Sequence, residues 1–148
     1  MANQLKSTNT SSKNIIRMIG VPLSGATGRR KKAVARVWAR RGNGKIVVNG
    51  KNYEQYFDTP AMRLGVARPL VVCEAAKNYD FQVNVFGGGK HGQSDAIKLG
   101  IARVLVALDS NLRSVLRQER LLTVDSRTKE RKKYGQRGAR RKFQFVKR

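Results

Sequence analysis

The chain has 148 residues, a length that fits one compact domain and leaves little room for a second. Lys and Arg number 32 against 9 Asp and Glu, and a formal net charge of +23 repels itself unless an anionic polymer neutralises it. Cys73 is the only cysteine, which excludes an internal disulfide and a Cys-based zinc site, and no apolar run approaches the ~18 residues of a membrane span.

The positive charge is concentrated toward the two ends of the sequence. Residues 1–53 hold 12 Lys and Arg and no carboxylate. Residues 54–126 hold 9 basic and 8 acidic residues, which is the balance of an ordinary globular body. Residues 127–148 hold 11 basic residues, with Glu130 as the only acid. This layout suits a protein that folds its middle and lays its ends along the phosphates of a nucleic acid.

These differences in composition predict three segments. We expect a disordered basic N-terminal extension, a globular domain and an extended RNA-binding tail, at residues 1–26, 27–124 and 125–148 respectively. The first 25 residues are rich in Ser, Thr and Asn and lack acids, so they also weakly resemble an organellar transit peptide. That alternative stays open, although no long amphipathic Arg-rich helix is evident there.

The first predicted elements form a hairpin. Residues 32–40 alternate, with alanines and Val37 on one face and Arg36 on the other, which predicts a half-buried strand with a basic outer face. Gly42-Asn43-Gly44 is typical of a turn, and residues 45–49 are predicted to return as the second strand. We therefore expect these two strands to pair as a β-hairpin.

Two helices are predicted next. Asn52 followed by Gln55 is typical of a capped helix start, and places Tyr53, Tyr56 and Phe57 on a short helix. Thr59-Pro60 begins another helix, which we expect Pro69 to end. The following residues 70–73 are β-like but ambiguous.

The second half of the body has the clearest patterns. Residues 79–86 alternate and predict a strand, and residues 93–108 have the apolar spacing of an amphipathic helix. Asp109 or Ser110 is expected to cap another short helix. After Leu122 the hydrophobic periodicity fades, so the remaining chain is expected to be disordered away from its partner.

The segment Gly87 to Gly92 satisfies G-x-G-x-x-G between a predicted strand and a predicted helix. A dinucleotide site would need further parallel strands and an acidic residue that ends the second strand, and Asp109 follows a helix instead. A turn that uses glycine's conformational freedom is the better interpretation. A third interpretation is that the backbone N–H groups at the start of the helix, beside Lys90 and His91, bind an RNA phosphate.

Enzymatic function is not favoured by the sequence. His91 is the sole histidine, so a His-based metal site or catalytic triad lacks partners, and no Walker-type phosphate loop occurs. The basic clusters instead predict binding of RNA phosphates, and Tyr134, Phe143 and Phe145 lie among the tail cations, where they can stack on bases. The candidate RNA-binding residues are Arg29, Arg30, Lys31, Lys32, Arg36, Lys90, His91, Arg131, Lys132, Lys133, Arg137, Arg140, Arg141 and Lys142. A DNA-architectural protein and a nucleotide-dependent enzyme are the alternatives.

Four segments of the chain are similar to a known family. They are Gly28 to Lys31, GNGKIVVNG at 42–50, GGGKHGQSDAIKLGIAR at 87–103 and ERKKYGQRGARRKFQF at 130–145 followed by Lys147-Arg148. From Thr27 to Arg148 the chain resembles the universal ribosomal protein S-nine family, bacterial type. The resemblance implies an α/β (α+β) two-layer sandwich like the second domain of ribosomal protein S-five, with no catalysis and no cofactor.

The resemblance also implies partners. These are the 3′ major domain of the small-subunit rRNA, neighbouring proteins of the subunit head and the peptidyl-site tRNA, with no membrane. Lys147 and Arg148 are the implied contacts to the anticodon stem-loop, and Val146 stands where the family commonly has serine. The implied location is the cytoplasmic ribosome, with an organellar ribosome as the lesser alternative.

Overall fold

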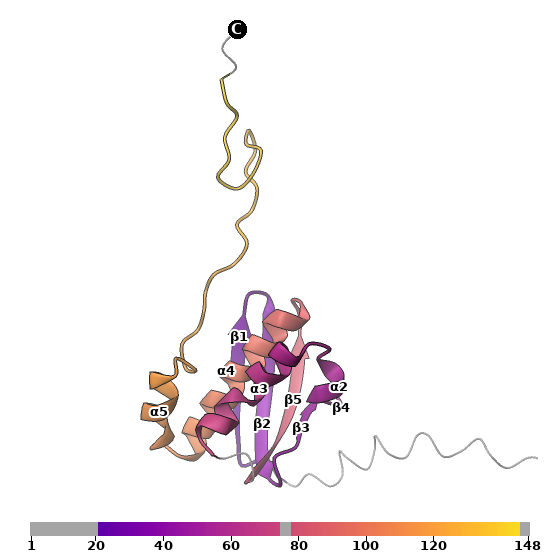
Figure 1. Ribbon diagram of the computed structural model, residues 1–148, viewed down its shortest axis with the longest axis vertical. Coiled ribbons are helices and arrows are strands. Elements are labelled where there is room, and N and C mark those ends of the chain that lie inside the picture. The colour runs from indigo at the N-terminus through magenta and orange to yellow at the C-terminus, as the bar shows by residue number, and fades with distance from the viewer. Residues whose placement is uncertain (1–20, 75–77, 146–148) are drawn as a thin grey trace, which may run out of the picture.

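A five-stranded sheet forms one layer of the domain, and helices cover one face of it (Figure 1). The computed structural model describes residues 21–74 and 78–145. The strands are β1 (Ser24–Arg30), β2 (Ala33–Arg41), β3 (Ile46–Val48), β4 (Lys51–Asn52) and β5 (Tyr79–Phe86). The helices are α2 (Tyr53–Tyr56), α3 (Pro60–Val72), α4 (Lys90–Leu108) and α5 (Leu112–Gln118). The expected mixed α/β class is therefore confirmed.

The strand order is β1-β2-β5-β3-β4, and every neighbouring pair is antiparallel except β3 with β5. The predicted hairpin between residues 32–40 and 45–49 is thus wrong, because β5 lies between β2 and β3. The backbone N–H groups of Asn43 and Lys45 each donate to Oδ1 of Asp80 at 2.8 Å, which holds the connection around the start of β5. The hairpin partner of β2 is β1, whose small residues give no clear alternation in the sequence.

A tight turn at Asn49-Gly50 joins β3 to β4. Both residues have positive φ, 48° and 81°, as a two-residue hairpin turn of the primed type requires. The side-chain amide of Asn49 also pairs with β5, since it donates to the carbonyl of Val85 and accepts from its N–H, both at 2.9 Å. Asn49 thereby extends the ladder between β3 and β5 beyond the last strand residue.

The helices begin near the predicted positions, but one ends later. Asn52 caps α2, as predicted, and its side chain accepts from the N–H of Glu54 at 3.3 Å. The expectation that Pro69 ends the next helix is wrong, because α3 continues through it to Val72 and includes most of the β-like segment. Proline removes one helical hydrogen bond, and burial of Pro69 and Leu70 offsets that loss in the last turns.

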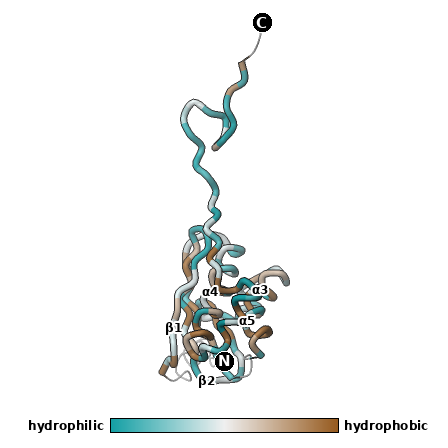
Figure 2. The backbone as a smooth tube through the Cα atoms, turned by 90° about the vertical axis from the view of Figure 1, so that its left-hand side faces the viewer, coloured by the Kyte–Doolittle hydropathy of each residue, from teal (hydrophilic) through white to brown (hydrophobic). Residues whose placement is uncertain are grey.

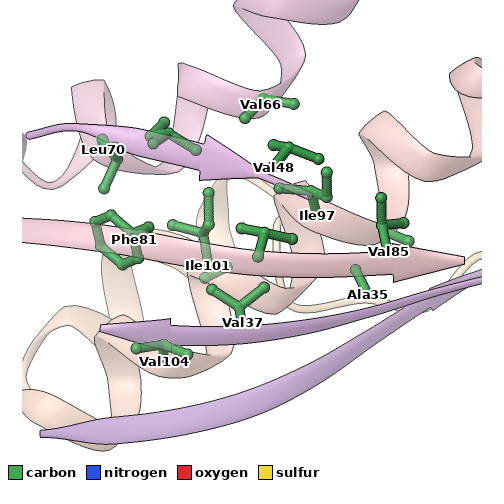
Figure 3. Packing of buried hydrophobic residues seen from close by; sticks show 14 of the residues in the cluster. Ala35, Val37, Val48, Val66, Leu70, Phe81, Val85, Ile97, Ile101 and Val104 are labelled. Carbon is green, nitrogen blue, oxygen red and sulfur yellow. The ribbon is translucent and has the colours of Figure 1, made fainter. Parts of the chain in front are cut away.

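The core lies between the inner face of the sheet and the helices α3 and α4, as Figure 3 shows. The inward side chains of β2 are small, and α4 approaches them closely with Ile97, Ile101 and Val104. Gly28 on β1 permits this approach, because an added Cβ would lie 1.9 Å from the carbonyl oxygen of Ala96.

The strand predicted at 79–86 is confirmed at both ends, and the helix predicted at 93–108 begins three residues earlier.

The β1–β2 turn, the β5–α4 loop and the start of the tail meet at one end of the domain (Figure 1). Beyond α5 the chain leaves this end and extends away from the domain without regular secondary structure up to residue 145. Figure 2 shows that this segment is mainly hydrophilic, with a few hydrophobic positions. No helix in the described ranges is both long enough and apolar enough to cross a membrane.

Candidate nucleic-acid interface

The β1–β2 turn presents a group of cations at the end of the sheet. Arg30 pairs with Ala33 in the strand register, so Lys31 and Lys32 form the turn, and Lys31 has a φ of 53°. Arg29, Lys31 and Lys32 are exposed. Three of the four basic residues predicted here thus have their charged groups in solvent, where a phosphate can reach them.

Arg30 differs from its neighbours because its side chain is 13% exposed and its guanidinium is used within the domain. It forms an ion pair with Asp125 at 2.8 Å and lies 3.7 Å from Asp95 on α4. It also donates hydrogen bonds to the backbone carbonyls of Asp125 and Arg127, at 3.0 and 2.7 Å. Arg30 therefore ties the root of the tail to β1 and α4, and the tail leaves the domain beside the exposed cations.

Asp125 is further held by the next turn of the tail. Its carboxylate accepts from the N–H and the guanidinium of Arg127, and these hydrogen bonds hold the pKa of Asp125 well below its ordinary range. A cavity of about 360 Å³ lies at this root and is lined by Arg29, Lys98, Arg120 and Arg127 beside the two carboxylates. Sequence reasoning missed this cluster, because its members are far apart in the chain and only the fold brings them together.

The glycine-rich segment is a tight turn between β5 and α4. Gly87 and Gly88 have positive φ, 71° and 62°, and an added Cβ at Gly87 would lie 2.4 Å from the carbonyl oxygen of Lys32. In the described ranges no strand follows α4, so the β-α-β unit of a dinucleotide site is not formed there. The structure supports the turn interpretation, in which the glycines are required for close contact with the β1–β2 turn.

The two candidate residues at the start of α4 both face carboxylates. Nζ of Lys90 lies 2.6 Å from Asp58, and this hydrogen bond lowers the pKa of Asp58. Nδ1 of His91 lies 3.5 Å from Asp95, and the His91 side chain is 78% exposed. Both side chains lie at the same end of the domain as the β1–β2 turn. Lys90 must, however, break its ion pair with Asp58 before it can bind a phosphate.

Cations and aromatic side chains alternate along the tail. Tyr134 and Phe145 are almost fully exposed, and Phe143 is 60% exposed with the guanidinium of Arg137 5.4 Å from its ring centroid. The remaining candidates of this segment, Arg131, Lys132, Lys133, Arg141 and Lys142, are exposed. The predicted contacts Lys147 and Arg148 lie outside the described residues.

One ion pair gives the tail a local loop. The guanidinium of Arg140 donates to Glu130 at 2.9 Å and lowers the pKa of that carboxyl group. The N–H of Arg137 donates to the carbonyl of Arg141 at 2.9 Å within the same loop. Glu130, the only acid of residues 127–148, therefore neutralises one of the tail cations, and the other basic side chains of the loop stay exposed.

The remaining candidate, Arg36, is exposed on the outer face of β2, away from the other groups. The structure therefore collects most candidates at one end of the domain and along the tail, and leaves Arg36 on the sheet. No cluster of three or more His, Cys, Asp or Glu suited to a metal ion occurs in residues 21–74 and 78–145.

Comparison with known proteins decides the family. The family model described as ribosomal protein S9/S16 matches residues 28–148. The chain belongs to this family. A small ribosomal subunit protein uS9 of Cytophaga hutchinsonii is 54% identical over 123 residues, which cover 83% of this chain and 96% of the relative. The proteins of the same name from Maridesulfovibrio salexigens and Solidesulfovibrio magneticus are 51% and 52% identical, and the matches cover 83% and 82% of this chain and 95% and 94% of the relatives.

Membership of the ribosomal protein S9/S16 family confirms the resemblance and makes the chain a bacterial-type structural constituent of the ribosome, not an enzyme. The nucleotide-dependent enzyme and the DNA-architectural protein are thereby set aside. The match begins at residue 28, within β1, and includes the exposed turn cations, the tail root and the tail. The candidate interface thus lies within the part of the chain that the family shares.

Proposed function

We propose that this member of the ribosomal protein S9/S16 family binds rRNA of the small-subunit head, in the 3′ major domain, and reaches peptidyl-site tRNA with the end of its tail. The observation that carries the proposal is the tie between Arg30 and Asp125 at 2.8 Å. It fixes where the tail leaves the domain, so the tail begins beside the exposed turn cations and its own exposed cations follow along the chain.

Phosphate neutralisation is the main source of affinity in this proposal. If about eight phosphates are contacted, the logarithm of the affinity should fall against the logarithm of the salt concentration with a slope of about −6 to −7. The exposed aromatic side chains of the tail add stacking on unpaired bases or riboses. A flat salt dependence would contradict a phosphate interface.

The reach of the tail supports the tRNA part of the proposal. Fully extended, residues 127–148 span roughly 70 Å, which is far beyond the radius of the domain. Arg148 can bind a phosphate through two parallel N–H groups, and Lys147 adds a second charge beside it. We propose that the tail is disordered before it meets RNA, because most of its side chains bury nothing within the chain.

Assembly with the small subunit is the first test. The tagged full-length protein should sediment with small subunits from a cytoplasmic lysate at high salt, and ribonuclease should release it. This outcome is the one expected if the protein lies in the cytoplasmic ribosome and has neighbouring proteins of the subunit head as further partners, as we propose. Sedimentation as free protein, or with DNA, would contradict the proposal.

Deletion of Lys147 and Arg148 tests the tRNA contact separately. Subunits that carry the shortened protein should assemble normally but lose peptidyl-site tRNA faster. The substitution Arg148→Lys, which keeps the charge but removes the forked guanidinium, should give an intermediate effect. Normal tRNA retention in the deletion variant would disprove the tRNA contact and leave the rRNA part of the proposal intact.

The second domain of ribosomal protein S-five is proposed as the structural relative of the body, and superposition of the two folds tests that likeness.

A further inference from the structure

The outer face of the sheet is turned away from α3 and α4. Figures 1 and 2 place both helices on the opposite side of β1 and β2. Successive side chains of a strand point to opposite faces, so the residues between the buried alanines and Val37 of β2 lie on this outer face. They are Val34, Arg36, Trp38 and Arg40. No described helix covers these side chains.

The strand register shows which residues of β1 and β5 lie beside Arg36 and Trp38 on this face. Arg36 lies between Thr27 of β1 and Asn84 of β5, and Trp38 lies between Gly25 and Gln82. Arg36 and Asn84 are exposed, whereas Trp38 and Gln82 are half-buried. A cation, an aromatic ring and two side-chain amides thus share a surface in which neighbouring positions are about 5 to 7 Å apart.

Trp38 lies against β1. An added Cβ at Gly25 would lie 2.9 Å from Cδ1 of the indole, so the ring occupies the space above a residue that has no side chain. The side chain is only half-buried there, and its remaining surface faces solvent. An indole supported in this way is a rigid platform on which a base can stack.

The charge of this face favours an anion. Arg29, Arg36 and Arg40 point to it from β1 and β2, and Asp80 is the one carboxylate that the described strands contribute. Oδ1 of Asp80 already accepts two backbone N–H groups. Arg40 is half-buried and its Nε is buried, so it adds positive charge to this face but no accessible hydrogen bond from Nε.

We infer that this outer face, centred on Trp38 and Arg36, is a second RNA-binding surface that takes a single-stranded or looped segment. A base stacks on the Trp38 indole, Arg36 binds an adjacent phosphate, and the amides of Gln82 and Asn84 donate to and accept from base edges. Paired RNA hides the faces of its bases, so a duplex gains only the phosphate contacts. This inference rests on the proposed rRNA-binding function and assigns a separate surface to it.

Trp38 is the only tryptophan, so its fluorescence reports on this face in the full-length protein. An unstructured 12-nucleotide RNA should quench the emission saturably and shield the indole from acrylamide, whereas a duplex of the same length should do neither. The substitution Trp38→Leu should weaken binding of the single strand by about fivefold or more relative to Trp38→Phe, which retains an aromatic ring.

Arg36→Gln should lower the affinity severalfold and reduce the magnitude of the salt slope by about 0.7. Arg113→Gln is the matched control, because it removes the same charge from an exposed residue of α5. Equal effects of the two variants, or RNA binding that leaves Trp38 emission and shielding unchanged, would overturn the inference while the proposed function stands. Absence of any RNA binding by the full chain would instead contradict the proposed function.

Directed cleavage tests the surface inside the particle. In a Cys73→Ser background, an iron chelate attached through Asn84→Cys should cut rRNA at unpaired nucleotides after incorporation into small subunits. An identical chelate attached through Arg113→Cys is the comparison on the helical side. No cleavage from position 84 in assembled subunits, or cleavage confined to duplex RNA, would mean that protein, solvent or paired RNA occupies this face and would overturn the inference.

Discussion

Nη2 of Arg30 and Oδ2 of Asp125 lie 2.8 Å apart, although 95 residues separate them in the sequence. The pair joins the first strand of the sheet to the root of the C-terminal tail. Since the Arg30 side chain is 13% exposed, the contact is partly shielded from solvent. Arg30 thus positions the tail, and its exposed neighbours remain available to RNA.

The substitution Arg30→Gln should release the tail root. It removes the ion pair and at least one of the hydrogen bonds to the carbonyls of Asp125 and Arg127. Amide hydrogen exchange of residues 121–127 should accelerate by about tenfold, because local opening no longer breaks these contacts. Arg29→Gln, which removes an exposed charge next to it, should leave exchange there unchanged. Equal exchange in both variants would contradict the role of Arg30.

The tie should also depend on pH. The pKa of Asp125 in the folded chain lies well below its ordinary 3.8, and the hydrogen bonds from Arg127 are the largest cause, ahead of the charge of Arg30. A lowered folded pKa means that the unfolded root binds the proton more readily. The stabilisation is therefore complete above pH 3.8 and is lost as the pH falls below that value through the folded pKa.

An NMR titration of the Asp125 carboxyl carbon measures this directly. Arg127→Gln should raise the pKa of Asp125 toward 3.8 more than Arg30→Gln does, since the hydrogen bonds of the Arg127 side chain are the largest cause of the shift and its charge adds to them, whereas its backbone N–H remains in the variant. The reverse order would show that the contact with Arg30 controls the carboxylate.

Local patterns predicted the elements of this fold better than their pairing. Alternation in residues 79–86 located β5 because every second side chain is buried. The hairpin after Gly42 failed because the same turn signal is compatible with either a direct return or a crossover past another strand. In the fold, hydrogen bonds to Asp80 hold this connection beside β5. Asp80 lies 37 residues beyond Asn43, so no local pattern could indicate the crossover.

Asp80→Ala should therefore destabilise the domain. It removes the acceptor of two backbone N–H groups at 2.8 Å, and the free energy of unfolding should fall by about 1–3 kcal/mol. Asp80→Asn retains a side-chain oxygen at the same position and should recover most of the loss. Urea unfolding followed by circular dichroism measures both variants, and equal destabilisation by the two would show that the charge of Asp80 matters and its acceptor geometry does not.

The candidate interface was predictable as a set of basic segments. Which of these basic side chains are free to bind phosphate, and which are already paired with a carboxylate of the chain, was not predictable. Arg30, Lys90 and Arg140 have carboxylate partners at 2.5 to 2.8 Å, and two of these partners are distant in sequence. The outer sheet face was visible only in part, as a basic side of one strand. Its register with Gly25, Gln82 and Asn84 required the pairing of β2 with both neighbours.

The close approach of β1 and α4 should be sensitive to a single methyl group. At Gly28 an added Cβ would lie 1.9 Å from the carbonyl oxygen of Ala96 and 2.6 Å from the N atom of Gly100, and backbone atoms of a buried helix cannot move aside as a side chain can. Gly28→Ala should lower the free energy of unfolding by about 3 kcal/mol, although alanine would otherwise suit a strand better than glycine.

Gly92→Ala is the matched control for this substitution. An added Cβ at Gly92 meets its nearest atom, the carbonyl oxygen of Arg30, at an ordinary 3.5 Å. Alanine also favours the helix by up to about 1 kcal/mol, so this variant should be neutral or slightly more stable in urea. If Gly28→Ala is as stable as the unmodified chain, β1 and α4 are farther apart in solution than the structure places them. The contact between Arg30 of β1 and Asp95 of α4 would then need a different geometry.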